Sequence, residues 1–173
     1  MIWYPCRMAS GVSEIVVATE FPDVELRSLT ALDAQVYFAV VVRSRDHLTL
    51  FGDYTELSTL TLADVRVDFA ALPEKGVRMG IWNGSDLVGR ADLNAVRSGH
   101  FVVGYWLGEG QTGRGFATAA VRALIDFGRA VLGATEFWAG VTHGNEASIR
   151  VLERLGFEFV ERLERHTRFH LAT

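Results

Sequence analysis

The chain has 173 residues, a length typical of one domain. Hydrophobic residues make up 49% and charged residues 22%, which is ordinary globular usage and excludes a wholly disordered chain. The net charge of -4 excludes nucleic acid held by bulk charge, and no apolar run reaches the length of a membrane span. Cys6 is the only cysteine, which excludes an internal disulfide and a cysteine-rich zinc site and predicts a cytoplasmic location.

The first residues have the character of an extension. Residues 2–6 are apolar but too short for a signal peptide, and Met8 offers a second start. We expect residues 1–13 to be disordered or mis-started, and a single domain to cover residues 14–173. No repeat, linker run or low-complexity stretch divides that domain.

In the first half, alternating apolar residues predict strands and apolar stripes predict helices. A turn at Pro22 separates two short strands, and Thr30 is a candidate cap for the first helix. That helix is expected to bury a stripe that includes Leu32 and Val36. The predicted elements are strands 14–18 and 24–28, helices 30–43 and 61–72, and a hairpin of strands 77–82 and 87–92.

The second half has a clearer pattern around a glycine-rich turn. An apolar run at 101–107, rich in β-branched and aromatic residues, predicts a buried strand. After residues 108–115 a long amphipathic helix is expected to reach Val131, which lies on its apolar face, and Gly133 ends it. A strand at 137–142, a helix at 145–155, and strands at 157–163 and 166–171 complete the chain. This order predicts an α+β fold with a mixed, mostly antiparallel sheet, helices beside it, and one parallel step at the glycine-rich turn.

The glycine-rich turn joins a strand to the start of a helix, where backbone N–H groups and the helix dipole favour a bound anion. Four glycines fall within eight residues, which a plain turn would not require: Gly108, Gly110, Gly113 and Gly115. A P-loop is excluded, because Arg114 stands where a lysine is needed. The glycine spacing also matches the dinucleotide fingerprint, but the next strand ends without the acidic residue that would hold a ribose.

Two segments of the second half resemble a known family. Gly-Arg-Gly-Phe-Ala at 113–117, behind Gly-Tyr-Trp-Leu at 104–107, is similar to the acyl-CoA pyrophosphate motif of the GCN5-related N-acetyltransferases. The segment at 145–157, Asn-Glu-Ala-Ser-Ile-Arg-Val-Leu-Glu-Arg-Leu-Gly-Phe, resembles their second signature, particularly in the ribosomal-protein alanine N-acetyltransferase branch. The likeness is strong over residues 88–160 and weaker over 24–82.

The resemblance implies a sheet whose two central strands splay apart, with the pantetheine arm of acetyl-CoA in the gap. A primary amine would then attack the thioester directly in a ternary complex. Asn145 would bind pantetheine or an ordered water, and Ser148 would protonate the departing sulfur. The resemblance places further acetyl-CoA contacts at Trp106, Leu107, Thr112, Gly113, Arg114, Gly115, Phe116, Ala117 and Thr118.

Two positions depart from the family pattern. Thr112 stands where relatives often have Gln or Arg, which removes one side-chain contact but keeps the backbone amides. Val102 stands where many relatives carry a carboxylate, so an obvious general base is missing. His100 lies two residues earlier on the same face of the strand and titrates near neutrality when unperturbed, so it is the candidate base.

The expected partners are acetyl-CoA and an amine acceptor, either a peptide N-terminus or a small molecule, with no nucleic acid and no membrane. The histidines are too scattered in sequence for a metal site. Relatives often pair as homodimers, so a dimer is also considered. Two other classes stay open: a catalytically silent acyl-CoA-binding regulator, favoured by the missing carboxylate at 102, and a dinucleotide-dependent oxidoreductase, favoured only by the glycine spacing.

Overall fold

A computed structural model of the chain describes residues 6–9, 12–71 and 76–172. The strands are β1 (Cys6–Ala9), β2 (Val12–Ala18), β3 (Val24–Ser28), β4 (Gly76–Asn83), β5 (Asp86–Arg97), β6 (His100–Leu107), β7 (Glu136–Thr142), β8 (Glu158–Arg162) and β9 (His166–Ala172). The helices are η1 (Ala31–Asp33), α1 (Ala34–Arg43), α2 (Arg45–Thr49), η2 (Thr55–Ser58), α3 (Leu62–Ala70), α4 (Phe116–Leu132) and α5 (Glu146–Arg154), where η marks a 3-10 helix.

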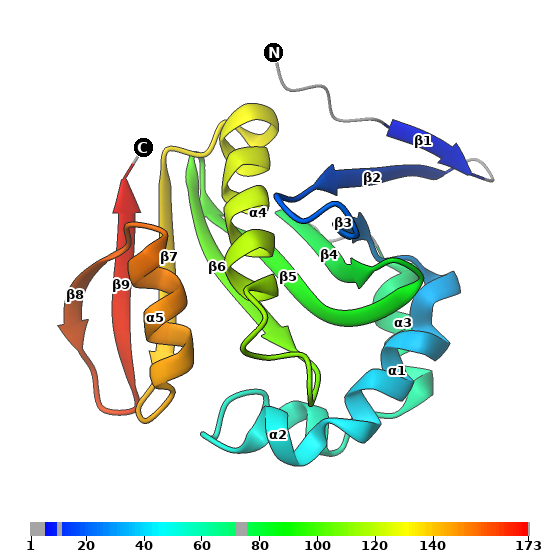
Figure 1. The fold of residues 1–173 in the computed structure, drawn as a ribbon, viewed down its shortest axis with the longest axis horizontal. Coiled ribbons are helices and arrows are strands. Elements are labelled where there is room, and N and C mark those ends of the chain that lie inside the picture. Colours follow the sequence, from blue (N-terminus) through cyan, green and yellow to red (C-terminus); the bar gives the residue numbers. More distant parts are fainter. Residues whose placement is uncertain (1–5, 10–11, 72–75, 173) are drawn as a thin grey trace.

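These strands form one twisted sheet with helices on both faces (Figure 1). The strand order is β1-β2-β3-β4-β5-β6-β7-β9-β8, and β6 with β7 is the only parallel pairing in the described part of the chain. The predicted α+β architecture is therefore confirmed. Within the same described residues, no helix combines the length and the apolar character that a membrane span requires.

The structure adds elements at the N-terminal side that the sequence does not predict. β1 pairs antiparallel with the start of β2, within the segment expected to be an extension. Residues 1–5 and 10–11 of that segment lie outside the described residues, and the domain boundary at residue 14 stays a prediction. α2 and the two 3-10 helices were also not predicted, since each is too short to show a helical period.

Two apolar clusters lie on opposite faces of the sheet. On one face, α4 packs a continuous stripe against the strands, including Phe116, Leu124 and Phe127. Val131, predicted to belong to this stripe, is 53% exposed in the last turn of α4. On the other face, α1 and α3 pack residues such as Tyr37 against the strands. The sheet is therefore held from both sides, which fixes the positions of its central strands.

The first predicted helix differs from the observed one in its buried face. Thr30 is an N-cap as predicted, but it caps η1, and the α-helix begins only at Ala34. The buried positions of α1 are Ala34, Tyr37, Val40 and Val41. Leu32 precedes the helix and is 85% exposed, and Val36 is also exposed, so the predicted stripe was wrong at both positions.

A charged network is buried between β5 and α1. Arg90 Nε donates to both carboxylate oxygens of Asp92, at 3.0 and 2.7 Å, and Arg90 Nη1 donates to the Tyr37 hydroxyl at 3.1 Å. The side chains of Arg90 and Asp92 are 25% and 11% exposed. Burial raises the pKa of Asp92, and the Arg90 guanidinium acts in the opposite direction. The pair thus links α1 to the sheet, and burying either charge without the other would cost free energy of folding.

The pairing of β6 with β7 positions the site. Their parallel register holds for three residue pairs, His100 with Glu136, Phe101 with Phe137 and Val102 with Trp138. Beyond these pairs β6 continues its ladder with β5, and β7 continues its ladder with β9, so their facing edges separate. Figure 1 shows the two strands diverging below α4. The splayed central strands expected from the sequence are confirmed.

Candidate active site

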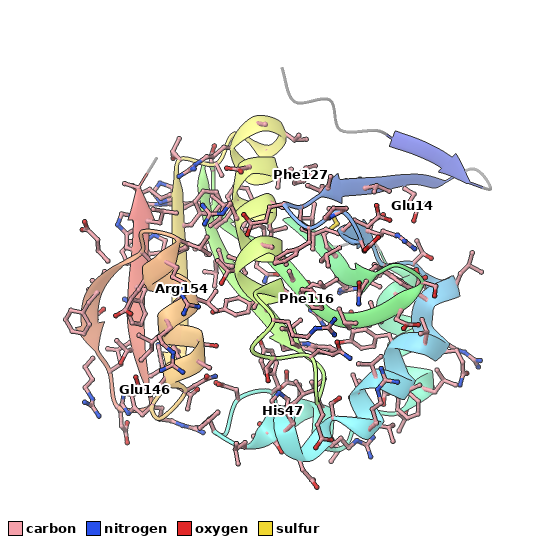
Figure 2. The ribbon with its side chains drawn as sticks, in the orientation of Figure 1. Glu14, His47, Phe116, Phe127, Glu146 and Arg154 are labelled. Carbon is pink, nitrogen blue, oxygen red and sulfur yellow. The ribbon has the colours of Figure 1, made fainter. Side chains whose placement is uncertain are left out.

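A pocket of about 500 Å³ lies at the diverging end of β6. Four segments line it: the end of β6, the glycine-rich turn with the start of α4, the segment from Asn145 into α5, and α2 with the loop after it. In Figure 2, Phe116 and Arg154 lie above this region and His47 below it. The lining residues are His47, Leu48, Leu50, Phe51, Asp53, Tyr54, Tyr105, Trp106, Leu107, Thr112, Gly113, Gly115, Phe116, Ala117, Thr118, Asn145, Ala147, Ser148, Arg150, Val151 and Arg154.

The glycine-rich turn has the backbone that an anion cradle needs. Gly113 and Gly115 adopt φ values of +75° and +84°, which L side chains rarely adopt. A Cβ at Gly113 would meet nothing within 4 Å among the described residues, so the space over this residue is open. Gly115 is the N-cap of α4, and the first N–H groups of a helix have no acceptor within the helix. Backbone donors therefore face an open space at the positive end of the α4 dipole.

The structure brings together most of the residues predicted to contact acetyl-CoA. Those that line the pocket are Trp106, Leu107, Thr112, Gly113, Gly115, Phe116, Ala117, Thr118 and Asn145. Arg114 does not line it: its guanidinium lies 4.5 Å from the centre of the Phe116 ring and donates to Gln111 Oε1 at 3.1 Å. The Trp106 ring packs in the core under α1, 5.6 Å from the Tyr37 ring, and the Trp106 backbone pairs with Arg90 of β5.

Ser148 is held in the pocket wall by contacts to its backbone on both sides. Asn145 is the N-cap of α5, and its Oδ1 accepts a hydrogen bond from the Ser148 N–H at 3.1 Å. The Tyr105 hydroxyl donates to the Ser148 carbonyl oxygen at 3.1 Å. Burial raises the pKa of Tyr105 to about 12, so the phenol stays protonated and keeps this hydrogen bond at neutral pH. Tyr105 thus ties β6 to α5 beside the gap.

His100 lies away from the pocket, at the opposite end of β6. Its Nδ1 is 2.7 Å from Glu136 Oε2, in the part of the strand that still pairs with β7. The pocket begins at Tyr105, five residues further along, which is about 16 Å in a strand. The sequence places His100 on β6 and strand alternation places it on the same face as Val102, but neither shows how far along the strand the pocket lies. The structure therefore does not bring His100 to the site.

The lining residues that were not predicted as site residues include Asp53, Tyr54, Arg150 and Arg154. The two arginines are four residues apart on α5 and share a helix face, a pattern that was visible in the sequence. Asp53 and Tyr54 follow α2 in a loop, where no period marks a functional residue. The Tyr54 hydroxyl donates to the Tyr105 carbonyl oxygen at 2.8 Å, and the Thr142 hydroxyl donates to Asp53 Oδ1.

Comparisons with known proteins identify the family. Residues 23–158 match the family profile described as "Acetyltransferase (GNAT) domain". The uncharacterized N-acetyltransferase YoaA of Bacillus subtilis is 29% identical over 140 residues, which is 77% of this chain and 78% of YoaA. The chain therefore belongs to the GNAT family and is an N-acetyltransferase. The resemblance found in the two sequence motifs is confirmed.

Solved structures confirm the fold. RimL, a ribosomal L7/L12 α-N-protein acetyltransferase in complex with coenzyme A, superposes with a TM-score of 0.79 at 16% identity, covering 91% of this chain and 97% of RimL. The microcin C7 self-immunity acetyltransferase MccE, in complex with acetyl-CoA and AMP, superposes with a TM-score of 0.74 at 16% identity, covering 88% and 94% of the two chains. The dinucleotide-binding alternative is not supported, because that fold needs a mostly parallel sheet.

Proposed function

We propose that the protein transfers the acetyl group of acetyl-CoA to a primary amine. The observation that carries this proposal is one pocket in which the α4 cradle, the open edge of β6 and Ser148 meet. The turn donors at Gly113 and Gly115 are suited to a diphosphate, and Arg150 with Arg154 adds positive charge toward a polyanion. The two similar solved structures were obtained with coenzyme A and with acetyl-CoA, which supports the same ligand class here.

The residues present fit acetyl-CoA along its length. The separated edges of β6 and β7 leave backbone groups that can pair with the pantetheine arm as with an added strand. A backbone N–H group at the open edge of β6, at Leu107, is suited to polarise the thioester carbonyl, an effect of about 10²–10³ in rate where a single donor has been removed in other enzymes. When bound, acetyl-CoA supplies the thioester and a thiolate leaving group.

We propose direct attack by the amine, without an acyl-enzyme. Cys6 is the only cysteine of the chain, and it lies in β1, at the edge of the sheet and far along the strand order from β6. Among the described residues no histidine forms a hydrogen bond with Ser148, so it lacks the base that an activated serine needs. A ternary complex of protein, acetyl-CoA and amine therefore accounts for transfer.

The proposed acceptor is a peptide or protein N-terminal amine, with small-molecule amines as the second candidate. RimL is described as an α-N-protein acetyltransferase, and MccE as a self-immunity acetyltransferase for microcin C7. The cytoplasmic location and the homodimer considered from the sequence stay predictions. Light scattering would test the dimer.

Isothermal titration with acetyl-CoA, followed by a thiol-release assay, tests the proposed function. We expect saturable binding of acetyl-CoA and release of free CoA when peptides with N-terminal Ala or Ser are added. Absence of binding at millimolar acetyl-CoA would overturn the proposal. Binding without release across peptides and small amines would identify the silent acyl-CoA-binding regulator that the valine at 102 left open.

Replacing Ser148 by alanine should lower kcat with little change in acetyl-CoA affinity. CoA departs as a thiolate, and because a free thiol has a pKa of about 8.5 the sulfur needs only a weak proton donor, which the serine hydroxyl supplies. Alanine keeps the propensity of α5 and both backbone contacts, so the change in unfolding free energy should stay below about 1 kcal/mol. Steady-state kinetics and thermal unfolding measure the two effects. Threonine at this position should restore part of kcat, and full activity of the alanine variant would show that another group protonates the sulfur.

A further inference from the structure

The loop after α2 forms hydrogen bonds with both of the strands that separate at the site, β6 and β7. Residues 51–54, which we call the strap, lie where the segment after α2 passes beneath the diverging ends of β6 and β7 (Figure 1). Tyr54 donates to a β6 carbonyl, that of Tyr105, at 2.8 Å. Its neighbour Asp53 accepts from the hydroxyl of Thr142, the last residue of β7. Two consecutive residues of the strap thus hold one strand each.

The backbone of the strap supports a fixed position for Asp53. Tyr54 has a φ of +52°, the only positive φ outside glycine in the described part of the chain. A bulky residue in this region is strained and persists only where its surroundings hold it. Burial also raises the pKa of Tyr54, so its hydroxyl remains a donor. Asp53 is therefore presented to the pocket by a rigid support.

Asp53 differs in charge from the rest of the pocket. Among the described lining residues it is the only carboxylate, whereas Arg150 and Arg154 make the α5 side cationic. A polyanionic co-substrate is suited to the cationic side, and an amine is suited to a carboxylate. Thr142 donates to Oδ1 of Asp53, and Oδ2 accepts no hydrogen bond from the described residues. Oδ2 is the oxygen left for an amine.

We infer that Asp53 Oδ2 accepts the N–H of the acceptor amine and takes its proton during transfer. This rests on the proposed function and adds the general base that the strand position 102 does not supply. Asp53 lies in the same pocket lining as Ser148 and Tyr105, so base and acid reach the thioester from the strap and from α5 respectively. His47 of α2 is the one histidine in the described lining, and it has no such link to β7.

The proton balance of the step closes with these two side chains. The amine nitrogen bonds to the thioester carbonyl carbon, and the C–S bond breaks with its electron pair leaving on sulfur. As the C–N bond forms, the nitrogen gains positive charge and becomes a strong acid, so an ordinary carboxylate is basic enough to take its proton. Sulfur takes a proton from the Ser148 hydroxyl, and water then removes the proton from Asp53 and restores that of Ser148. The products are an amide and a free thiol.

The test compares Asp53→Asn with Glu56→Gln in the full-length protein. Asparagine can still accept from Thr142 but has no basic oxygen, while Glu56 is an exposed acid of η2 outside the pocket lining. With a peptide that wild type acetylates, we expect Asp53→Asn to lower kcat/KM for the peptide about 100-fold. Acetyl-CoA affinity should be unchanged in both variants, and Glu56→Gln should keep wild-type rates.

A binding measurement separates this inference from the proposed function. Peptide is titrated into protein saturated with CoA, so no transfer is needed. We expect Asp53→Asn to bind the peptide amine at least tenfold more weakly than wild type. Equal peptide binding together with kcat/KM within threefold of wild type would overturn the role of Asp53, while wild-type turnover in the same assay would leave the proposed function standing. If wild type neither binds nor acetylates any peptide, the inference is also overturned for peptide amines.

Discussion

An Arg90→Met variant should lose about 3–5 kcal/mol of unfolding free energy at neutral pH, because removal of one partner leaves a buried charge uncompensated. Arg90 donates hydrogen bonds to Asp92 at 2.7 and 3.0 Å and to the Tyr37 hydroxyl at 3.1 Å. The substitution therefore leaves both groups buried under α1 without this partner. Urea unfolding followed by fluorescence would measure the loss. A loss below about 1 kcal/mol would mean that water reaches Asp92 and replaces the guanidinium.

The loss should shrink as the pH falls. Burial already raises the pKa of Asp92 and Arg90 opposes that rise, so the variant raises the pKa further. An acid whose pKa is higher in the folded state than in the unfolded state does not affect stability below the unfolded pKa of about 3.9, where both states are protonated. Above that pH the unfolded state loses its proton more readily, so the fold is destabilised, and the effect is complete above the folded pKa. The difference between variant and wild type should therefore be largest near neutrality and decline toward pH 4.

A double variant provides the control for the same pair. Arg90→Met with Asp92→Leu removes both charges and leaves an apolar contact, and such replacements are often neutral or stabilising. We expect the double variant to recover most of the stability lost by Arg90→Met. If the double variant is instead less stable than Arg90→Met, the uncompensated charge of Asp92 is not the cause of the stability lost in the single variant.

A Gly113→Asp variant should bind acetyl-CoA about a thousandfold more weakly than wild type. The added carboxylate would stand over the cradle, where a Cβ meets open space. Two like charges 4 Å apart repel by about 4 kcal/mol at an effective dielectric of 20, and that energy corresponds to the stated factor. The backbone at φ +75° adds strain but leaves the neighbouring atoms in place. Isothermal titration would measure the affinity.

Gly133→Asp is the matched control for that variant. Gly133 also has a positive φ, of +66°, with nothing within 4 Å of a Cβ among the described residues, but it caps the far end of α4. It should reproduce the backbone strain and keep wild-type affinity for acetyl-CoA. If both variants lose affinity equally, general damage to α4 and not charge in the cradle is responsible.

The parts of the site that could be predicted from the sequence are those fixed by local chemistry. The glycines before α4 and the cap at Asn145 act on the backbone next to them, so their spacing is enough to locate a cradle and a helix start. Asp53 and His100 show the limit. Asp53 reaches the pocket through a contact to Thr142, 89 residues away, and His100 misses it because its position along β6 depends on where β7 diverges.

The short register between β6 and β7 leaves a line of missing backbone pairing in the middle of the sheet, beyond Val102 and Trp138, which we call the seam. The part of the sheet made by β7, β9 and β8 pairs with the remainder through only three residue pairs between β6 and β7. Packing in the core shared with α4, the strap, and the Tyr105 contact to Ser148 of α5 hold the two parts together. Regions with few backbone hydrogen bonds open at lower free energy than the remainder of a fold. A ligand that fills the seam completes the sheet and, at a hundred times its Kd, adds about 2.7 kcal/mol against unfolding. The stability of the folded chain is then coupled to the supply of that ligand.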